Sequence, residues 1–170
     1  VAALGPLQDL LQQAAGLDDE ARLDAINAWF NRRVIFRTDD SASGEADHWA
    51  SPLESLARGQ GDCEDYAIAK YFILVAAGVP ESRLRLVYVR ATVGRGRPQT
   101  MAHMVLAYHP APNAEPLILD NLVGAVLPAS SRARTRAVWV PSAGKPAAPK
   151  PYSQSPAAMV ASFQIGRAHV

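Results

Sequence analysis

The sequence is poor in three features, each of which would point to a particular class of protein. Its 170 residues include one cysteine, so neither an internal disulfide nor a cysteine-rich zinc cluster can form. Lys and Arg total 17 against 16 Asp and Glu, and a formal charge of +1 gives no general attraction to nucleic acid or anionic lipid. No apolar run approaches the roughly 20 residues that cross a bilayer. We therefore expect no nucleic-acid partner and no direct membrane insertion.

The composition nevertheless provides enough apolar material for a folded core. Hydrophobic residues make up 49% of the chain, and a length of 170 residues corresponds to one domain. From Pro141 onward the composition shifts to Pro, Ala, Ser and Lys, which is typical of a linker or arm. We predict a folded domain over residues 1–140 and a C-terminal arm over 141–170.

The hydrophobic pattern changes its period about halfway along the chain. Apolar residues first recur at helical spacing and then alternate, with short turn-forming segments between the alternating runs. The expected helices are 6–13, 19–33, a short one from 52, and 63–78, and the expected strands are 84–90, 102–108, 116–120 and 137–140. Helices followed by a meander of strands predict an α+β fold, with N-terminal helices packed on a small antiparallel sheet.

The single cysteine lies in an unusual local sequence. Two glycines, Gly59 and Gly61, precede Cys63, and an apolar, helix-forming run follows it. This order places the thiol in the first turn of a buried helix, where unpaired N–H groups and the helix dipole favour a negatively charged thiolate. A lone cysteine is more often an inert core residue. A core cysteine needs no glycine-rich approach, so we interpret Cys63 as a nucleophile.

A cysteine nucleophile needs a base, and the base needs an orienting partner. His103 lies near the start of the second predicted strand, and Asp120 ends the third. Taken separately, His103 would be a structural strand histidine and Asp120 a turn cap. Antiparallel pairing of the two strands would bring Asp120 to the His103 ring, and the packed helix would bring Cys63 to the other ring nitrogen.

Three segments resemble the bacterial transglutaminase-like cysteine proteinases. They are Trp49–Tyr71 around Gly-Asp-Cys-Glu-Asp-Tyr, Ala102–Leu106 around His103, and Leu119–Leu122 around Asp120. The likeness extends from about Trp29 to Pro128 and does not reach the arm. It implies a papain-like or transglutaminase-like core with Cys63 as nucleophile, His103 as base and acid, and Asp120 as the orienting residue.

The resemblance also implies a biological role. Members that process surface proteins are periplasmic and cut a large adhesin next to a di-alanine sequence in its N-terminal region. Release of the adhesin from the outer membrane then disperses a biofilm. An inner-membrane receptor for cyclic-di-GMP binds such a protease through its periplasmic domain. We therefore expect two partners, the adhesin and this receptor domain.

Three acidic residues surround the nucleophile. Asp62 at a helix N-cap, with Glu64 and Asp65 in the first turn, would have a purely structural explanation. The same charges, however, should oppose ionisation of the neighbouring Cys63 thiol. A hard cation would resolve this conflict, and calcium takes about six to eight oxygen ligands.

The calcium assignment rests largely on the family resemblance, because these residues do not have EF-hand spacing. The resembling proteases depend on calcium, and their Asp-Cys-Glu acids match Asp62 and Glu64. Asp47 in the acidic loop before Trp49 is the expected third ligand, with Asp39 and Asp40 as weaker candidates.

Two other readings remain open from the sequence. The same triad could transfer the acyl group to an amine, as in a transglutaminase, or hydrolyse amide bonds in cell-wall peptides. A non-catalytic binding module could also keep the fold. Elsewhere in the chain, Arg132, Arg134 and Arg136 are expected on a solvated strand edge.

Overall fold

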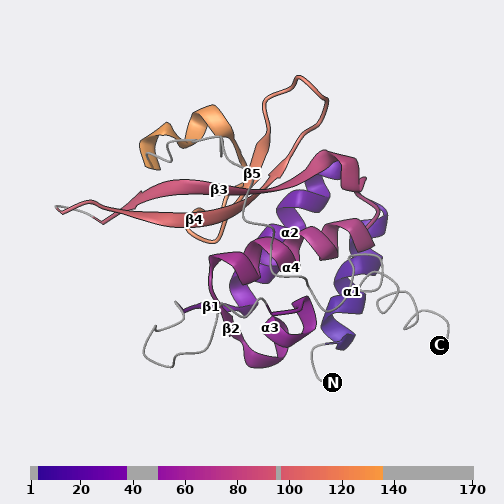
Figure 1. The fold of residues 1–170 in the computed structure, drawn as a ribbon. Helices are drawn as coiled ribbons and strands as arrows, with labels where there is room; N and C mark the ends of the chain where they lie inside the picture. The colour runs from indigo at the N-terminus through magenta and orange to yellow at the C-terminus, as the bar shows by residue number, and fades with distance from the viewer. Residues whose placement is uncertain (1–3, 38–49, 95–96, 136–170) are drawn as a thin grey trace.

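The computed structural model of the chain describes residues 4–37, 50–94 and 97–135. The helices are α1 (Leu4–Ala15), α2 (Asp19–Arg33), α3 (Pro52–Arg58) and α4 (Cys63–Ala76), with two 3₁₀ turns, η1 (Glu81–Arg83) and η2 (Ala129–Thr135). The strands are β1 (Ile35–Phe36), β2 (Gln60–Gly61), β3 (Leu84–Val93), β4 (Gln99–Tyr108), β5 (Leu117–Leu119) and β6 (Leu127–Pro128). Helices come first and an antiparallel sheet follows, which confirms the predicted α+β fold (Figure 1).

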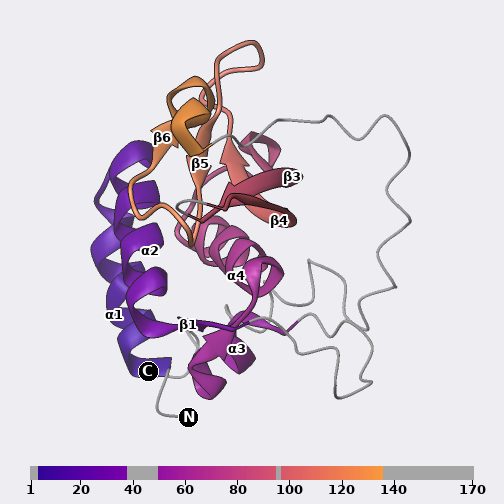
Figure 2. The ribbon, with the colours of Figure 1, turned by 90° about the vertical axis from the view of Figure 1, so that its left-hand side faces the viewer.

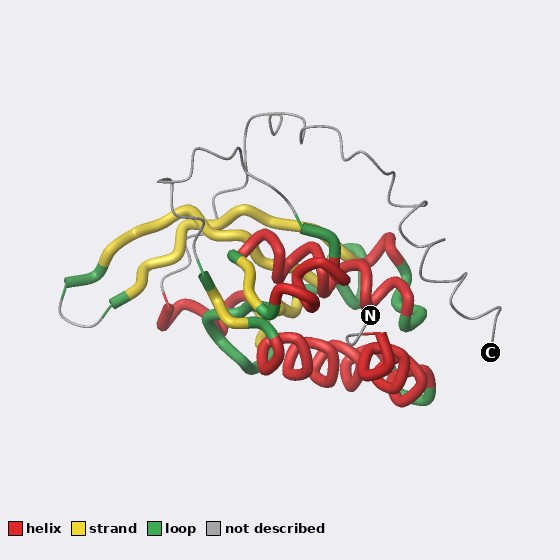
Figure 3. The backbone as a smooth tube through the Cα atoms, turned by 90° about the horizontal axis from the view of Figure 1, so that it is seen from below, coloured by secondary structure: helices red, strands yellow, loops and turns green. Residues whose placement is uncertain are grey.

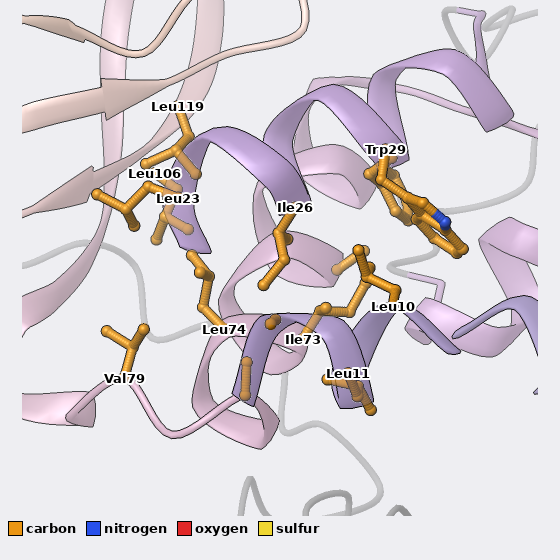
Figure 4. Packing of buried hydrophobic residues seen from close by; sticks show 14 of the residues in the cluster. Leu10, Leu11, Leu23, Ile26, Trp29, Ile73, Leu74, Val79, Leu106 and Leu119 are labelled. Carbon is orange, nitrogen blue, oxygen red and sulfur yellow. The ribbon is translucent and has the colours of Figure 1, made fainter. Parts of the chain in front are cut away.

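The main core lies where the N-terminal helices meet α4 and the sheet. Helix α2 begins at the N-cap Asp18, whose side chain accepts a hydrogen bond from the Ala21 N–H. Its apolar stripe packs against α1, α4 and the sheet, as Figure 4 shows for ten labelled side chains: Leu10, Leu11, Leu23, Ile26, Trp29, Ile73, Leu74, Val79, Leu106 and Leu119. Burial of these apolar side chains provides most of the free energy that holds the helices to the sheet.

The four-stranded sheet has the order β3-β4-β5-β6, and every pairing in it is antiparallel. Strands β3 and β4 pair along their full ten-residue lengths and extend beyond the helices (Figure 3). Strand β5 pairs with β4 only from Leu106 to Tyr108. The part of β4 before Leu106 therefore lacks a β5 neighbour.

Two layers cover the sheet. Helix α4 lies on one side and packs mainly against β4, whereas η2 lies on the other side (Figures 1 and 2). Beneath η2 a smaller apolar cluster contains Val89, Val105, Ala107 and Ile118, with Ala129 of η2 packed against it. Helix α4 and the later segment η2 thus pack against opposite faces of the sheet.

Two details differ from the expectation. The fourth strand of the described sheet is β6, while the strand predicted at 137–140 and the arm predicted at 141–170 lie outside the described residues. Strands β1 and β2 also form a short parallel pair, Ile35 with Gln60 and Phe36 with Gly61. The sequence indicates an extended segment at 34–36 but not its pairing with 60–61. Across residues 4–37, 50–94 and 97–135, every helix is too short or too polar to cross a membrane.

Candidate active site

The nucleophile candidate lies at a sharply defined helix start. Helix α3 ends at Gly59, whose left-handed backbone (φ +66°) suits glycine. Asp62 then caps α4 by accepting hydrogen bonds from the Glu64 and Asp65 N–H groups, at 2.9 and 3.0 Å. Asp65 completes the capping box by accepting from the Asp62 N–H at 3.3 Å. Cys63 is thereby fixed as the first residue of α4.

Gly61 is required by this arrangement for a steric reason. A Cβ atom at this position would lie 2.8 Å from Asp65 Oδ2 and 2.9 Å from Asp65 Cβ. The Asp65 side chain cannot move away easily, because its Oδ1 also accepts a buried hydrogen bond of 2.9 Å from the Ala50 N–H. The Gly-Asp-Cys-Glu-Asp sequence is thus partly a capping structure that presents Cys63, whose side chain is half-buried.

His103 lies on the part of β4 that has no β5 neighbour. Its ring is almost completely buried, with 1% of the residue exposed. Its Nε2 donates to Asp120 Oδ1 at 2.8 Å. Within the described part of the chain, its Nδ1 is buried and makes no hydrogen bond of normal geometry. The Cys63 thiol is nevertheless close enough to affect the ionisation of this ring.

The surroundings stabilise the protonated form of His103. Burial alone would lower its pKa, but the hydrogen bond with the Asp120 carboxylate and the nearby Cys63 thiol together raise the pKa to about 9. The Asp120 carboxyl shows the reciprocal effect. Burial would raise its pKa, but His103, the Leu122 N–H and Arg132 together lower it. The pair therefore favours an imidazolium held by a carboxylate.

Several segments converge on Asp120, which follows the last residue of β5. Its Oδ1 also accepts from the Leu122 N–H at 3.0 Å, and its Oδ2 forms a buried ion pair with Arg132 of η2. Its backbone carbonyl accepts a 2.8 Å hydrogen bond from Asn31 Nδ2 on α2. The position of this carboxylate is thus fixed by α2, η2 and the loop after β5.

The structure corrects the expectation for Arg132. It lies on η2 rather than on a strand, and it is 5% exposed rather than solvated. Arg136 lies outside the described residues. Three arginines at alternating positions suggested an exposed strand, and nothing in that pattern indicated that one of them is an ion-pair partner of Asp120. The sequence also did not indicate the roles of Asn27 and Asn31 on α2, which donate hydrogen bonds to the backbone carbonyls of Gly124 and Asp120. Their spacing of four residues places both on one helix face, but nothing in that spacing identifies the partners.

A fully buried lysine lies on α4 about two turns after Cys63. Among the described residues, the Lys70 Nζ atom has no hydrogen-bond partner. It lies 5.3 Å from the centre of the Tyr66 ring. Burial lowers its pKa to about 7; the negative charge of Asp120 opposes this shift and the positive charge of Arg132 adds to it.

The predicted calcium ligands fit the metal in their chemistry, but the described residues supply too few of them. Asp62 and Glu64 offer carboxylate oxygens, the ligands that calcium prefers. Glu64 Oε1 also accepts a 2.6 Å hydrogen bond from the Tyr88 hydroxyl on β3. No group of three or more His, Cys, Asp or Glu side chains that could hold a metal ion occurs in residues 4–37, 50–94 and 97–135. Asp47, Asp39 and Asp40 lie outside these ranges.

The structure thus brings Cys63, His103 and Asp120 together from α4, β4 and the end of β5. Such a set can form a thiolate beside an imidazolium, attack a carbonyl carbon and transfer a proton to a leaving group. The backbone N–H of Cys63, in the first turn of α4, is a candidate donor to the oxyanion.

Comparison with known proteins agrees with this chemistry. Residues 9–140 match the family model of the bacterial transglutaminase-like cysteine proteinases, BTLCP. Calcium-bound LapG from Legionella pneumophila is 38% identical, with a TM-score of 0.68 and coverage of 78% of this chain and 70% of LapG. The EGTA-treated form of the same LapG is 39% identical, with a TM-score of 0.66 and coverage of 75% and 65%. The chain thus spans about two thirds of the LapG chains, and no curated protein matches it.

Proposed function

The chain belongs to the bacterial transglutaminase-like cysteine proteinases, and we propose that it is a calcium-dependent cysteine endopeptidase of the periplasm. Its substrate is a large surface adhesin, which it cuts near a di-alanine sequence so that the adhesin is released and a biofilm disperses. The observation that carries the proposal is the meeting of Cys63, His103 and Asp120 at one point, with Asp120 bonded to the His103 ring.

In the first half of the reaction, the Cys63 thiolate attacks the carbonyl carbon of the scissile peptide. The N–H of Cys63 donates to the developing oxyanion. The His103 imidazolium gives its proton to the leaving amine, the C–N bond breaks, and a thioester with Cys63 remains. Asp120 keeps the ring in position and stabilises its positive charge before the transfer.

In the second half, the neutral His103 takes a proton from water as the water oxygen attacks the thioester carbonyl. The C–S bond then breaks and releases the carboxylic acid product and the Cys63 thiolate. The imidazolium beside the thiolate is restored, so protons and charge balance over the cycle. The high pKa of His103 suits it to its role as the acid in the first half.

Calcium would be held by Asp62 and Glu64, with Asp47 supplying a further carboxylate from the loop before α3. The ion would neutralise the acidic charge next to the nucleophile and hold the segment that starts α4. The calcium-bound form of the similar LapG supports this part of the proposal. The periplasmic domain of an inner-membrane cyclic-di-GMP receptor is the proposed regulatory partner.

The proposal is tested with the full chain and two synthetic peptides that differ only in a central Ala-Ala or Asp-Asp pair. We expect cleavage of the Ala-Ala peptide alone, lost with excess chelator and restored by calcium. Cys63→Ala serves as the inactive control. Equal cleavage of both peptides would contradict the di-alanine specificity, and equal activity with calcium and with chelator would contradict the metal requirement.

The same experiment separates endopeptidase from acyl-transfer activity. A primary amine is added at high concentration, and the products are identified by mass spectrometry. A free carboxyl terminus on the N-terminal fragment supports hydrolysis. An amide formed with the added amine would instead support a transglutaminase reaction through the same thioester.

A further inference from the structure

The Asp120 carboxylate is held from two sides by groups with different chemical roles. Oδ1 accepts a hydrogen bond from His103 Nε2 at 2.8 Å, and Oδ2 forms an ion pair with the Arg132 guanidinium. The side chains of Arg132 and Asp120 are only 4% and 2% exposed, so solvent does not screen the pair. A buried ion pair needs both partners, because an unpaired charge in this environment would be strongly unfavourable.

The two partners also come from different parts of the fold. His103 is on β4, whereas Arg132 is on η2, which covers the opposite side of the sheet from α4 (Figure 2). An arginine side chain is planar and always charged, so it can fix the orientation of a carboxylate as well as balance its charge. Nothing in the proposed mechanism uses Arg132.

We propose that Arg132 is a positioning residue, whose guanidinium holds the Asp120 carboxylate in the orientation in which Oδ1 receives the His103 ring. The proposal deepens the assignment of a cysteine protease and rests on it. Segment η2 is then part of the catalytic apparatus, although it lies far from the nucleophile in the sequence.

The amine of Lys70, a second basic group that interacts with Asp120, makes it possible to test this role. Within residues 4–37, 50–94 and 97–135, the charged and titratable groups that interact with the His103–Asp120 pair include Cys63 and Lys70 on α4 and Arg132 on η2. If Arg132 were absent, the carboxylate could turn toward the Lys70 amine and leave the ring. Loss of position and loss of charge would then change the proton affinity of His103 in opposite directions.

The experiment compares the unchanged chain with Arg132→Met, Arg132→Lys, Asp120→Asn and the Arg132→Met/Asp120→Asn double variant. The His103 ring is titrated by NMR of histidine-labelled protein and assigned by its loss in His103→Gln. The rate of Cys63 alkylation by iodoacetamide provides a second measurement. Neither readout uses a peptide, so failure of the proposed substrate specificity would leave this test intact.

A positioning role predicts that Arg132→Met moves the His103 midpoint downward by about one pH unit, in the same direction as Asp120→Asn. Arg132→Lys should shift it less, because an amine keeps the charge but lacks the planar fork. Alkylation should slow about tenfold in Arg132→Met and no further in the double variant than in Asp120→Asn alone. Arg85→Met, which removes an exposed arginine of β3, should change neither readout.

Two results would overturn the inference. An upward shift in Arg132→Met would mean that Arg132 acts only as a positive charge. An unchanged midpoint, with a lower melting temperature, would mean that it only stabilises the fold. If Arg132→Met does not fold, Arg132→Lys decides: a midpoint and an alkylation rate equal to those of the unchanged chain would contradict positioning.

Discussion

The two halves of the site are built in opposite ways. The helix half consists of Asp62, Cys63, Glu64 and Asp65, four consecutive residues that are acidic around the thiol and held by their own capping box. The sheet half, around His103 and Asp120, is buried and also contains the basic side chains of Lys70 on α4 and Arg132 on η2. It is assembled from segments that are far apart in the sequence, such as Asn31 on α2 and Asp120 after β5. The nucleophile is thus placed by local structure, whereas its base depends on tertiary contacts. Variants in the two halves should therefore differ in what they change.

The largest effect is expected from removing the nucleophile. Cys63→Ser should reduce peptide cleavage by about 10⁴-fold or more, because a hydroxyl beside the same histidine is a much weaker nucleophile. The melting temperature should change little, since the capping box does not involve the Cys63 side chain. Cleavage that persists at more than a tenth of the original rate would place the nucleophile elsewhere.

Removing the carboxylate charge should be nearly as damaging to catalysis. Asp120→Asn should lower kcat about 10²- to 10⁴-fold with little change in KM, because the ring loses its orienting acceptor and the stabilised imidazolium. The His103 pKa should fall from about 9 toward its ordinary value of 6.5. The loss of activity on the alkaline side of the pH profile should therefore begin at a lower pH than in the unchanged chain.

The matched control is Asp24→Asn, which removes an exposed carboxylate from α2 and should leave the kinetics unchanged. An Asp120→Asn protein with the original pH profile would show that the base does not depend on this residue.

Lys70 gives the sheet half a stability cost that the helix half does not have. Its folded pKa of about 7 lies below its unfolded value of 10.5, so only the unfolded chain holds this proton between these pH values. The free energy of unfolding should therefore rise with pH across this window. Lys70→Met should be more stable than the unchanged chain at pH 6, by about 3 kcal/mol, and should lack this rise.

Urea unfolding at pH 6, 8 and 10 measures both quantities, with Arg32→Met as a control for removing an exposed cation. If Lys70→Met is no more stable than the unchanged chain at pH 6, the lysine has a compensating partner and the account of this half is wrong.

The stability of the helix half should depend most on the absence of a side chain at Gly61. Gly61→Ala would place a Cβ atom 2.8 Å from Asp65 Oδ2 and disturb the capping box. We expect a loss of about 1 to 3 kcal/mol in the free energy of unfolding. Gly16→Ala is the matched control, because a Cβ there meets nothing within 4 Å. Equal stabilities of the two variants would show that Asp65 moves aside without cost.

The smallest effect should come from the contact between α2 and the Asp120 backbone. Asn31→Ala removes the 2.8 Å hydrogen bond to the Asp120 carbonyl. We expect a loss of about 1 kcal/mol of stability and a decrease of about threefold in kcat. The exposed Asn113→Ala should change neither quantity. If Asn31→Ala reduces stability without affecting kcat, α2 supports the fold but not the site.

The helix half could be predicted from the sequence because its signals are local. Gly59, Gly61 and Asp62 mark the end of one helix and the start of the next through conformational and capping preferences that act within a few residues. The alternating runs likewise predicted β3, β4 and β5 in the correct order, and short turns made them antiparallel neighbours.

The sheet half could be predicted only in part. His103 and Asp120 could be paired because their strands are adjacent, but the partners Arg132, Asn31 and Lys70 are fixed by tertiary packing. A fully buried lysine in an apolar helix gives no local signal that separates it from an exposed one. Two-residue strands such as β6 also carry too little pattern to be predicted.

The central claim is that the buried His103 activates the half-buried thiol of Cys63. Because the chain has one cysteine, iodoacetamide alkylation followed by mass spectrometry reports on this residue alone. At pH 6 the unchanged chain should react about 100-fold faster than His103→Gln, since the imidazolium stabilises the reactive thiolate. Equal rates in the two proteins would contradict the account.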